Sequence, residues 1–465
     1  MKELPQSLFD VYALALPRGH GFGNALPIHT WQSDDGLAFG VVTCNEKDSF
    51  FGLLVARRRI DNVWTVIADH SDIRLLDEAL HKLSILLKSG EPPEPIPSNT
   101  APRPVLYDFK NRQVSDLFKL LTKPSHHIAA WMLNQLYLAL PSPDANWAGD
   151  FQTSNFHTRM WEVQLLATFR EQGLLVTQPS ISPDFLIENR HGDIAWVEAV
   201  TANPKRRYNH VNAEPSKPPK NMEKRLIGEA AERFAKTIGN KLGKKYCDQP
   251  DVSGKPFIIA LADFHAPGSM TWSRGALMSY LYGAYPLVEV VNGQRTASLK
   301  PIKRLLGESQ FPAGLFCNQE NSELSAIIFT NACTIGKFNR VGVSAGANAN
   351  GLRYIRIGEF YDRTPGALAG IPFCLDISSS EYRSLWPQGY EPWCAEIEVF
   401  HNPYAKHPVS KKLLPEITHW YEDNKEIVCS SFYETSILYS KTLIQNETDK
   451  MPSIHELMAK DSCKR

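Results

Sequence analysis

Three acidic residues in the middle of the chain stand in apolar surroundings. Glu162, Asp184 and Glu198 together span 37 residues. A buried carboxylate is costly unless a cation, a hydrogen-bond donor or a proton compensates it. Carboxylate oxygens suit Mg²⁺ or Mn²⁺, and such an ion acidifies a bound water and offsets charge on a phosphoryl oxygen. The three acids therefore predict a divalent-metal site suited to phosphoryl chemistry; the alternative is three unrelated, solvated acids.

The first acid belongs to a predicted helix over residues 156–173. On a helical wheel, Leu166 and Phe169 both fall within about 40° of Glu162. Glu162 is therefore expected in the middle of the apolar face, where an aliphatic side chain would be usual.

The other two acids belong to two short predicted strands, 184–188 and 194–201, joined by a turn. In the second strand neither of the two alternating sets of side chains is polar, which indicates a strand in the centre of a sheet. Glu198 is expected inside that strand. Asp184 opens the first strand directly after Pro183, where a side chain can point out of the end of a sheet.

A long helix is predicted from 221 to 246, with apolar residues at every fourth position. Measured from Phe234, Lys241 and Lys245 both fall within about 20° of the packed face. One interpretation is that a lysine reaches the acids and orients a water molecule. The other is that both lysines extend their ammonium groups to solvent at the helix end.

The segment 205–245 carries twelve Lys or Arg residues and four acidic ones, whereas the whole chain has a formal net charge of zero. A basic segment beside an acidic metal site fits a polyanionic backbone, which predicts nucleic acid as the partner. The alternative is an ordinary solvated basic face. No motif for reading bases is visible in the sequence.

This combination of residues resembles the PD-(D/E)xK, or restriction-endonuclease-like, superfamily. The resemblance rests on Glu162 in a helix, Pro-Asp at 183–184, Val-Glu at 197–198, and the lysine-bearing helix and buried strand that follow. It covers about 150–270, a quarter of the chain.

The resemblance implies a mixed central sheet flanked by helices and Mg²⁺-dependent hydrolysis of phosphodiesters. By the same resemblance, Asp184 and Glu198 are metal ligands, and Glu162 is an accessory acid on the first core helix. A role in restriction or in defence against foreign DNA is an analogy at the level of the fold.

The sequence departs from the superfamily at the lysine. The motif has Glu-x-Lys on one strand, but Val200 stands two residues after Glu198. Lys241 is the first candidate to replace that lysine, and Lys245 is the second. The alternative is a catalytically inactive module that keeps the fold and binds nucleic acid or protein. A third hypothesis, an unrelated α/β enzyme that uses His401, lacks an identifiable nucleophile.

Composition and segment boundaries complete the expectations. The chain has 465 residues, 43% of them hydrophobic, and eight cysteines that form no CxxC pair. Neither a signal peptide nor an apolar run of membrane-spanning length is visible, which favours a cytoplasmic protein. Four segments are predicted: an N-terminal α/β domain (1–90), a proline-rich linker with helices (91–149), an endonuclease-like core (150–345) and a C-terminal β-rich region (346–465).

Overall fold

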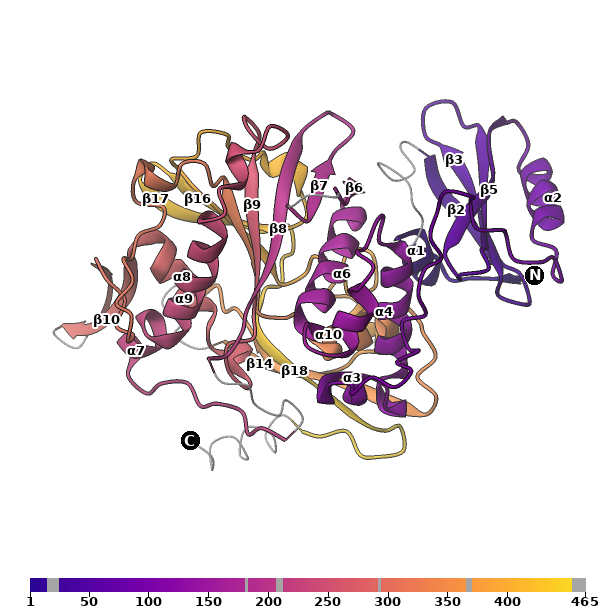
Figure 1. Ribbon diagram of the computed structural model, residues 1–465. Helices are drawn as coiled ribbons and strands as arrows, with labels where there is room; N and C mark the ends of the chain where they lie inside the picture. Colours follow the sequence, from indigo (N-terminus) through magenta and orange to yellow (C-terminus); the bar gives the residue numbers. More distant parts are fainter. Residues whose placement is uncertain (15–24, 180–182, 206–211, 292–293, 365–369, 454–465) are drawn as a thin grey trace.

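The computed structural model describes residues 1–14, 25–179, 183–205, 212–291, 294–364 and 370–453 (Figure 1). They form a mixed α/β architecture around one eight-stranded sheet, accompanied by five-, three- and two-stranded sheets. The α/β class predicted from alternating helices and apolar strands is confirmed. No helix within the described residues is long and apolar enough to cross a membrane.

The central sheet has the strand order β17-β16-β15-β12-β9-β8-β7-β6. β8, β9 and β12 are parallel to one another. β7 runs antiparallel to β8, and β15 runs antiparallel to β12. Every residue of β9 and β12 is buried, as expected for apolar strands in the middle of a sheet. The strands are β6 (Leu175–Thr177), β7 (Phe185–Glu188), β8 (Ile194–Ala202), β9 (Phe257–Asp263), β12 (Ala326–Thr330), β15 (Ile397–His401), β16 (Thr418–Asp423) and β17 (Glu426–Ser430).

Helices cover both faces of this sheet (Figure 1). On one face α6 (Phe156–Glu171) is fixed to β9, because the indole Nε1 of Trp161 donates a hydrogen bond to the carbonyl of Ala260 at 2.9 Å. On the other face lie α7 (Met222–Ile227), α8 (Glu229–Leu242) and α9 (Arg274–Tyr282). The side chains of β8 divide between the two cores, with Ala195, Val197 and Ala199 on the α6 side and Trp196, Val200 and Ala202 on the α8 side.

The N-terminal segment forms an antiparallel sheet with one helix on each face. Its strands are β1 (Lys2–Glu3), β2 (Ala25–Gln32), β3 (Ala38–Asn45), β4 (Phe51–Arg58) and β5 (Trp64–Ile73). α2 (Leu76–Leu86) packs on one face, and α1 (Gln6–Leu14) packs on the other. On the α1 side the apolar core continues into α6 and the three helices before it. These are α3 (Asp116–Leu121), α4 (His127–Ala139) and α5 (Trp147–Gln152).

The strands after residue 346 have two different destinations. β15, β16 and β17 extend the central sheet beyond β12, whereas three others form a separate antiparallel sheet in the order β14-β13-β18. The latter are β13 (Leu352–Phe360), β14 (Ile371–Asp376) and β18 (Ile437–Asn446). The remaining α-helices are α10 (Ile335–Ser344) and α11 (Ser380–Arg383), and β10 (Ala284–Val291) forms a hairpin with β11 (Gln294–Pro301).

The prediction of one continuous helix from 221 to 246 is wrong. The chain forms α7 and α8 with a break at Gly228, whose backbone φ of −89° and ψ of −137° is not helical. A helical periodicity of apolar residues carries no information about such a break, because the stripe continues on both sides of it. The second helix ends at Leu242, so Lys241 is in its last turn and Lys245 lies beyond it.

The break predicts opposite effects of alanine at two glycines. Gly228→Ala should lower the free energy of unfolding by about 1–3 kcal/mol, because the added methyl would lie 2.2 Å from the Lys224 carbonyl oxygen. Gly239→Ala within α8 is the matched control and should raise it by about 0.5–1 kcal/mol, since nothing lies within 4 Å of its position. Urea denaturation measures both, and equal stabilities of the two variants would contradict the assignment of the break.

Candidate functional site

Two of the predicted acids lie opposite each other, one at the start of β7 and one within β8. The register pairs Phe185 with Val197, so Asp184, one residue earlier, stands opposite Glu198. The backbone N–H of Ala199 donates a hydrogen bond to Asp184 Oδ2 at 2.8 Å, which fixes the carboxylate against β8. The sheet thus brings together two carboxylates that are fourteen residues apart in the sequence.

Glu198 is almost completely buried, at 2% exposure, on the α8 side of the sheet. Its Oε1 accepts hydrogen bonds from Lys241 Nζ and, at 2.8 Å, from the hydroxyl of Tyr246. Its Oε2 is also buried but has no hydrogen-bond partner among the described residues. A buried carboxylate oxygen without a partner is unfavourable, and it is available to a cation that enters the site.

Burial and the neighbouring carboxylates raise the pKa of Asp184. Burial is the largest cause and the charges of Glu198 and Glu162 add to it, whereas the hydrogen bond from Ala199 and the charge of Lys241 oppose the shift; together these bring the pKa to about 7. One ammonium group therefore does not compensate the cluster. A divalent cation would complete the compensation and displace the proton of Asp184.

Glu162 satisfies its charge elsewhere. It lies on α6, where Oε2 accepts a hydrogen bond from the indole of Trp147 at 2.7 Å and both oxygens accept from Arg159 at 3.1 Å. Arg159 also binds Asp144 and Asp150, at 2.7 and 2.8 Å. Burial raises the pKa of Glu162, and the cation and donor oppose that rise. Glu162 therefore influences Asp184 through its charge, while its own hydrogen bonds belong to a separate group.

The two candidate lysines have different surroundings. Lys241 extends from the last turn of α8 to Glu198, from the helix that packs on the same side of the sheet. Lys245 is exposed and has a φ of 52° at the end of the helix. Val200, at the position where the motif would have its lysine, is buried in the apolar core on the α8 side. The structure thus brings Lys241 to the acids and leaves Lys245 outside.

Tyr246 is a member of this site that the sequence analysis did not identify. It continues the apolar stripe of residues 222–246, which predicted a packed aromatic ring and gave no reason to consider its hydroxyl. The ring does pack in the core, against Phe257. A buried tyrosine hydroxyl requires a partner, and that requirement is the only signal in the sequence that could have indicated its contact with Glu198.

The donor set fits a hard divalent cation only with help from outside the chain. Asp184 and Glu198 offer two carboxylates, and no group of three or more His, Cys, Asp or Glu ligands suited to a metal occurs among the described residues. Mg²⁺ is commonly held by one or two carboxylates, with waters and substrate phosphates as its other ligands. The unpartnered Oε2 of Glu198 fits that kind of binding.

His401 is not placed for acid–base catalysis. Its Nε2 lies 2.9 Å from Nδ1 of His419, whose other ring nitrogen lies 2.9 Å from the carbonyl of Leu414. Burial, together with the nearby charges of His419 and Lys411, lowers the pKa of His401 to about 3. The imidazole is therefore neutral at physiological pH and takes part in a chain of hydrogen bonds.

The basic segment is partly outside the described residues, which do not include 206–211. Within its described part, Lys205 pairs with Glu308 at 2.7 Å, and the Arg233 Nε donates to the Asn203 carbonyl at 3.0 Å. Most of the other basic side chains are exposed, namely Lys217, Lys220, Lys224, Arg225, Lys236, Lys244 and Lys245. The expected concentration of positive charge is therefore at the surface, on the α8 side of the sheet.

Comparisons with protein-family models, with curated proteins and with solved structures give no match to this chain. The chemistry of the site has to follow from its own geometry and charge.

The raised pKa of Asp184 predicts a pH-dependent gain in stability on its replacement by asparagine. The ordinary pKa of the carboxyl is 3.8, and in the folded chain it is about 7. Between these values the folded chain keeps a proton that the unfolded chain has released, so the wild type loses stability as pH rises through this window. Asp184→Asn has no such proton, and its melting temperature should rise relative to wild type from about pH 4 to about pH 7 and then level off.

Thermal denaturation across this pH range, with a chelator present, measures the difference. Asp69→Asn is the control, because Asp69 is an exposed carboxylate on β5. A difference for Asp184→Asn that is as flat with pH as that of the control would show that Asp184 has an ordinary pKa.

Proposed function

We propose that the chain is a divalent-metal-dependent phosphodiesterase that cleaves nucleic acid, with DNA as the favoured substrate. The order of elements supports a restriction-endonuclease-like core: α6, the antiparallel run β6-β7-β8, α8, and then β9 parallel to β8. Asp184 at the start of the second strand of this run and Glu198 on the third occupy the positions that the resemblance implies for metal ligands.

The contact of Lys241 with Glu198 is the observation that carries the proposal. The motif lacks its strand lysine, and a neighbouring helix supplies an ammonium group to the same carboxylate. A lysine without a partner near a helix end would be expected to extend into solvent, whereas Lys241 is held at Glu198. This contact supports a motif whose ammonium group comes from a different element.

Each side chain has a distinct task in this proposal. Asp184 and Glu198 hold Mg²⁺ or Mn²⁺, and Tyr246 keeps Glu198 in a fixed orientation through its hydroxyl. When bound, the ion supplies stabilisation of charge on a phosphoryl oxygen and acidifies water. Lys241 orients the attacking water with its ammonium group. Attack forms one P–O bond and breaks another, and the leaving oxygen takes up a proton.

Single substitutions at the site test the proposal. With Mg²⁺ or Mn²⁺, the wild type should cut plasmid DNA, and Asp184→Ala, Glu198→Ala and Lys241→Ala should each lower the rate by at least about 100-fold, the usual cost of losing one charge-stabilising group. Lys245→Ala is the matched control and should cut at the wild-type rate, because its side chain is exposed and outside the site. Gel analysis of cut plasmid measures the five rates.

The pattern of rates separates the proposal from its alternatives. Equal cutting by all variants would identify a contaminating nuclease. No cutting by the wild type, on plasmid, single-stranded DNA or RNA, would favour an inactive nuclease-fold module that binds nucleic acid or protein. A shift in melting temperature with Mn²⁺ that disappears in Asp184→Ala would then show whether the metal site itself exists.

A further inference from the structure

A cavity lies away from the acidic site, at the end of the central sheet where β12 ends and β15 and β16 begin. Its volume is about 540 Å³, and it lies between this end of the sheet and the segment 429–438, which leads from β17 into β18. Small-molecule sites usually have volumes of about 300–1,000 Å³. Asp184, Glu198 and Lys241 do not line this cavity, so it is separate from the acidic site.

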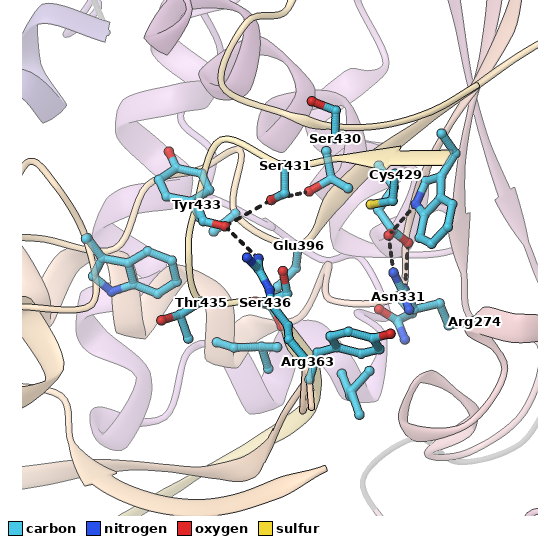
Figure 2. A pocket seen from close by; sticks show the side chains of 18 residues that line it. Arg274, Asn331, Arg363, Glu396, Cys429, Ser430, Ser431, Tyr433, Thr435 and Ser436 are labelled. Atoms are coloured by element: carbon cyan, nitrogen blue, oxygen red, sulfur yellow. Dashed lines mark hydrogen bonds and ion pairs between the residues drawn. The ribbon is translucent and has the colours of Figure 1, made fainter. Parts of the chain in front are cut away.

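One wall of the cavity is a fixed and neutral group. Arg274 donates from Nε to Glu398 Oε2 at 2.7 Å, and the indole of Trp420 donates to Glu398 Oε1 at 2.9 Å (Figure 2). The charges of Arg274 and Glu398 therefore cancel. This wall provides shape and an aromatic surface rather than a free charge.

A buried group of charges behind the cavity has more cations than carboxylates. Lys337, Arg340 and Arg356 surround Glu391 and Glu396, and all five side chains are at most 8% exposed. Glu391 accepts from Lys337 at 2.8 Å and from Arg340 at 3.0 Å, and Glu396 accepts from Arg340 at 3.2 Å. Glu396 also lines the cavity. Three cations and two carboxylates leave one positive charge uncompensated in this group.

A further cation stands at the mouth of the cavity. The only hydrogen bond of the Arg363 guanidinium among the described residues runs from Nη2 to the carbonyl of Tyr433 at 3.3 Å, and within the same residues it forms no ion pair. Arg363, Thr435, Ser436 and Ser430 all line the cavity (Figure 2). These three hydroxyls also have no hydrogen-bond partner within the described part of the chain.

Aromatic rings accompany these donors. Trp420 lines the cavity, and its ring is stacked on Phe400 with an interplanar angle of 7°. Tyr361 also lines the cavity, and its side chain is unusually exposed for an aromatic residue, at 54%. Flat rings of this kind bind a planar ligand by stacking.

From these features we infer that the cavity binds a nucleotide. The phosphate would bind Arg363, and the net positive charge of the buried group behind the cavity would attract it without direct contact. The hydroxyls would bind phosphate and sugar oxygens, and the base would stack on Trp420 or Tyr361. The inference does not depend on the acidic site. Two sources share this chemistry: a free mononucleotide and a nucleotide unit of a strand.

Calorimetric titration tests the inference on the full chain, with a chelator present so that the acidic site takes no part. AMP, GMP, CMP and UMP are the probes, and adenosine and ribose 5-phosphate are AMP lacking one recognised part. At least one mononucleotide should bind, and both truncated probes should bind at least about tenfold more weakly than AMP, as expected on loss of a charge-assisted contact or a stacked ring.

Two variants with little risk to folding assign the binding to this cavity. Arg363→Gln and Tyr361→Ser should each weaken the bound mononucleotide at least about tenfold, whereas Arg74→Gln, an exposed arginine in the segment before α2, should bind like wild type. The same titrations with a short single-stranded oligonucleotide distinguish a free mononucleotide from a nucleotide unit of a strand. If the natural ligand is part of a strand, the oligonucleotide should bind, and Arg363→Gln should weaken its binding too. Absence of mononucleotide and oligonucleotide binding, or wild-type affinity in Arg363→Gln, would overturn the inference.

Discussion

Glu198 places a carboxylate in the middle of a strand that is covered on both faces, and much of the surrounding structure compensates for it. β8 is paired on both sides, with β7 and with β9, so its backbone cannot shift to bring Glu198 to solvent. The Glu198 side chain is 2% exposed. Compensation has to come from outside the strand, and Lys241 and Tyr246 supply it from the end of α8 and the turn beyond. It remains incomplete, since one carboxylate oxygen has no partner in the described structure.

Glu162 and Glu198 are both buried, and they are compensated in different ways. Arg159 reaches Glu162 from the preceding turn of the same helix, so that pair forms with local helical structure. Lys241 is 43 residues from Glu198 in the sequence, so their contact requires α8 to pack on the sheet. Arg159 and the Trp147 indole donate to both oxygens of Glu162, whereas Oε2 of Glu198 has no partner within the described residues.

The spacing of apolar and polar residues along the sequence predicted much of the fold and the positions of several site residues. The apolar runs at 184–188 and 194–201 predicted β7 and β8, because buried strands leave a clear pattern. The wheel placed Glu162 in a packed face and Lys241 toward the sheet, as the structure has them.

Pairing between distant segments could not be predicted in the same way. No local pattern in residues 397–430 says that they extend the sheet next to β12, so the cavity between them was not foreseen. The break at Gly228 and the hydroxyl of Tyr246 were also missed, because each depends on a single atom rather than on a periodicity.

The position of β12 has a consequence for any attempt to divide this polypeptide. Its five residues, Ala-Ile-Ile-Phe-Thr, hydrogen-bond to β9 on one side and to β15 on the other. A fragment that stopped after α10 would keep the residues of the acidic site but lose β15. β12 would then be an exposed, apolar edge strand whose backbone N–H and C=O groups on one side have no strand to pair with. Such an edge invites pairing with other copies, so precipitation of the shortened protein would reflect a missing neighbour rather than a failure of the centre to form.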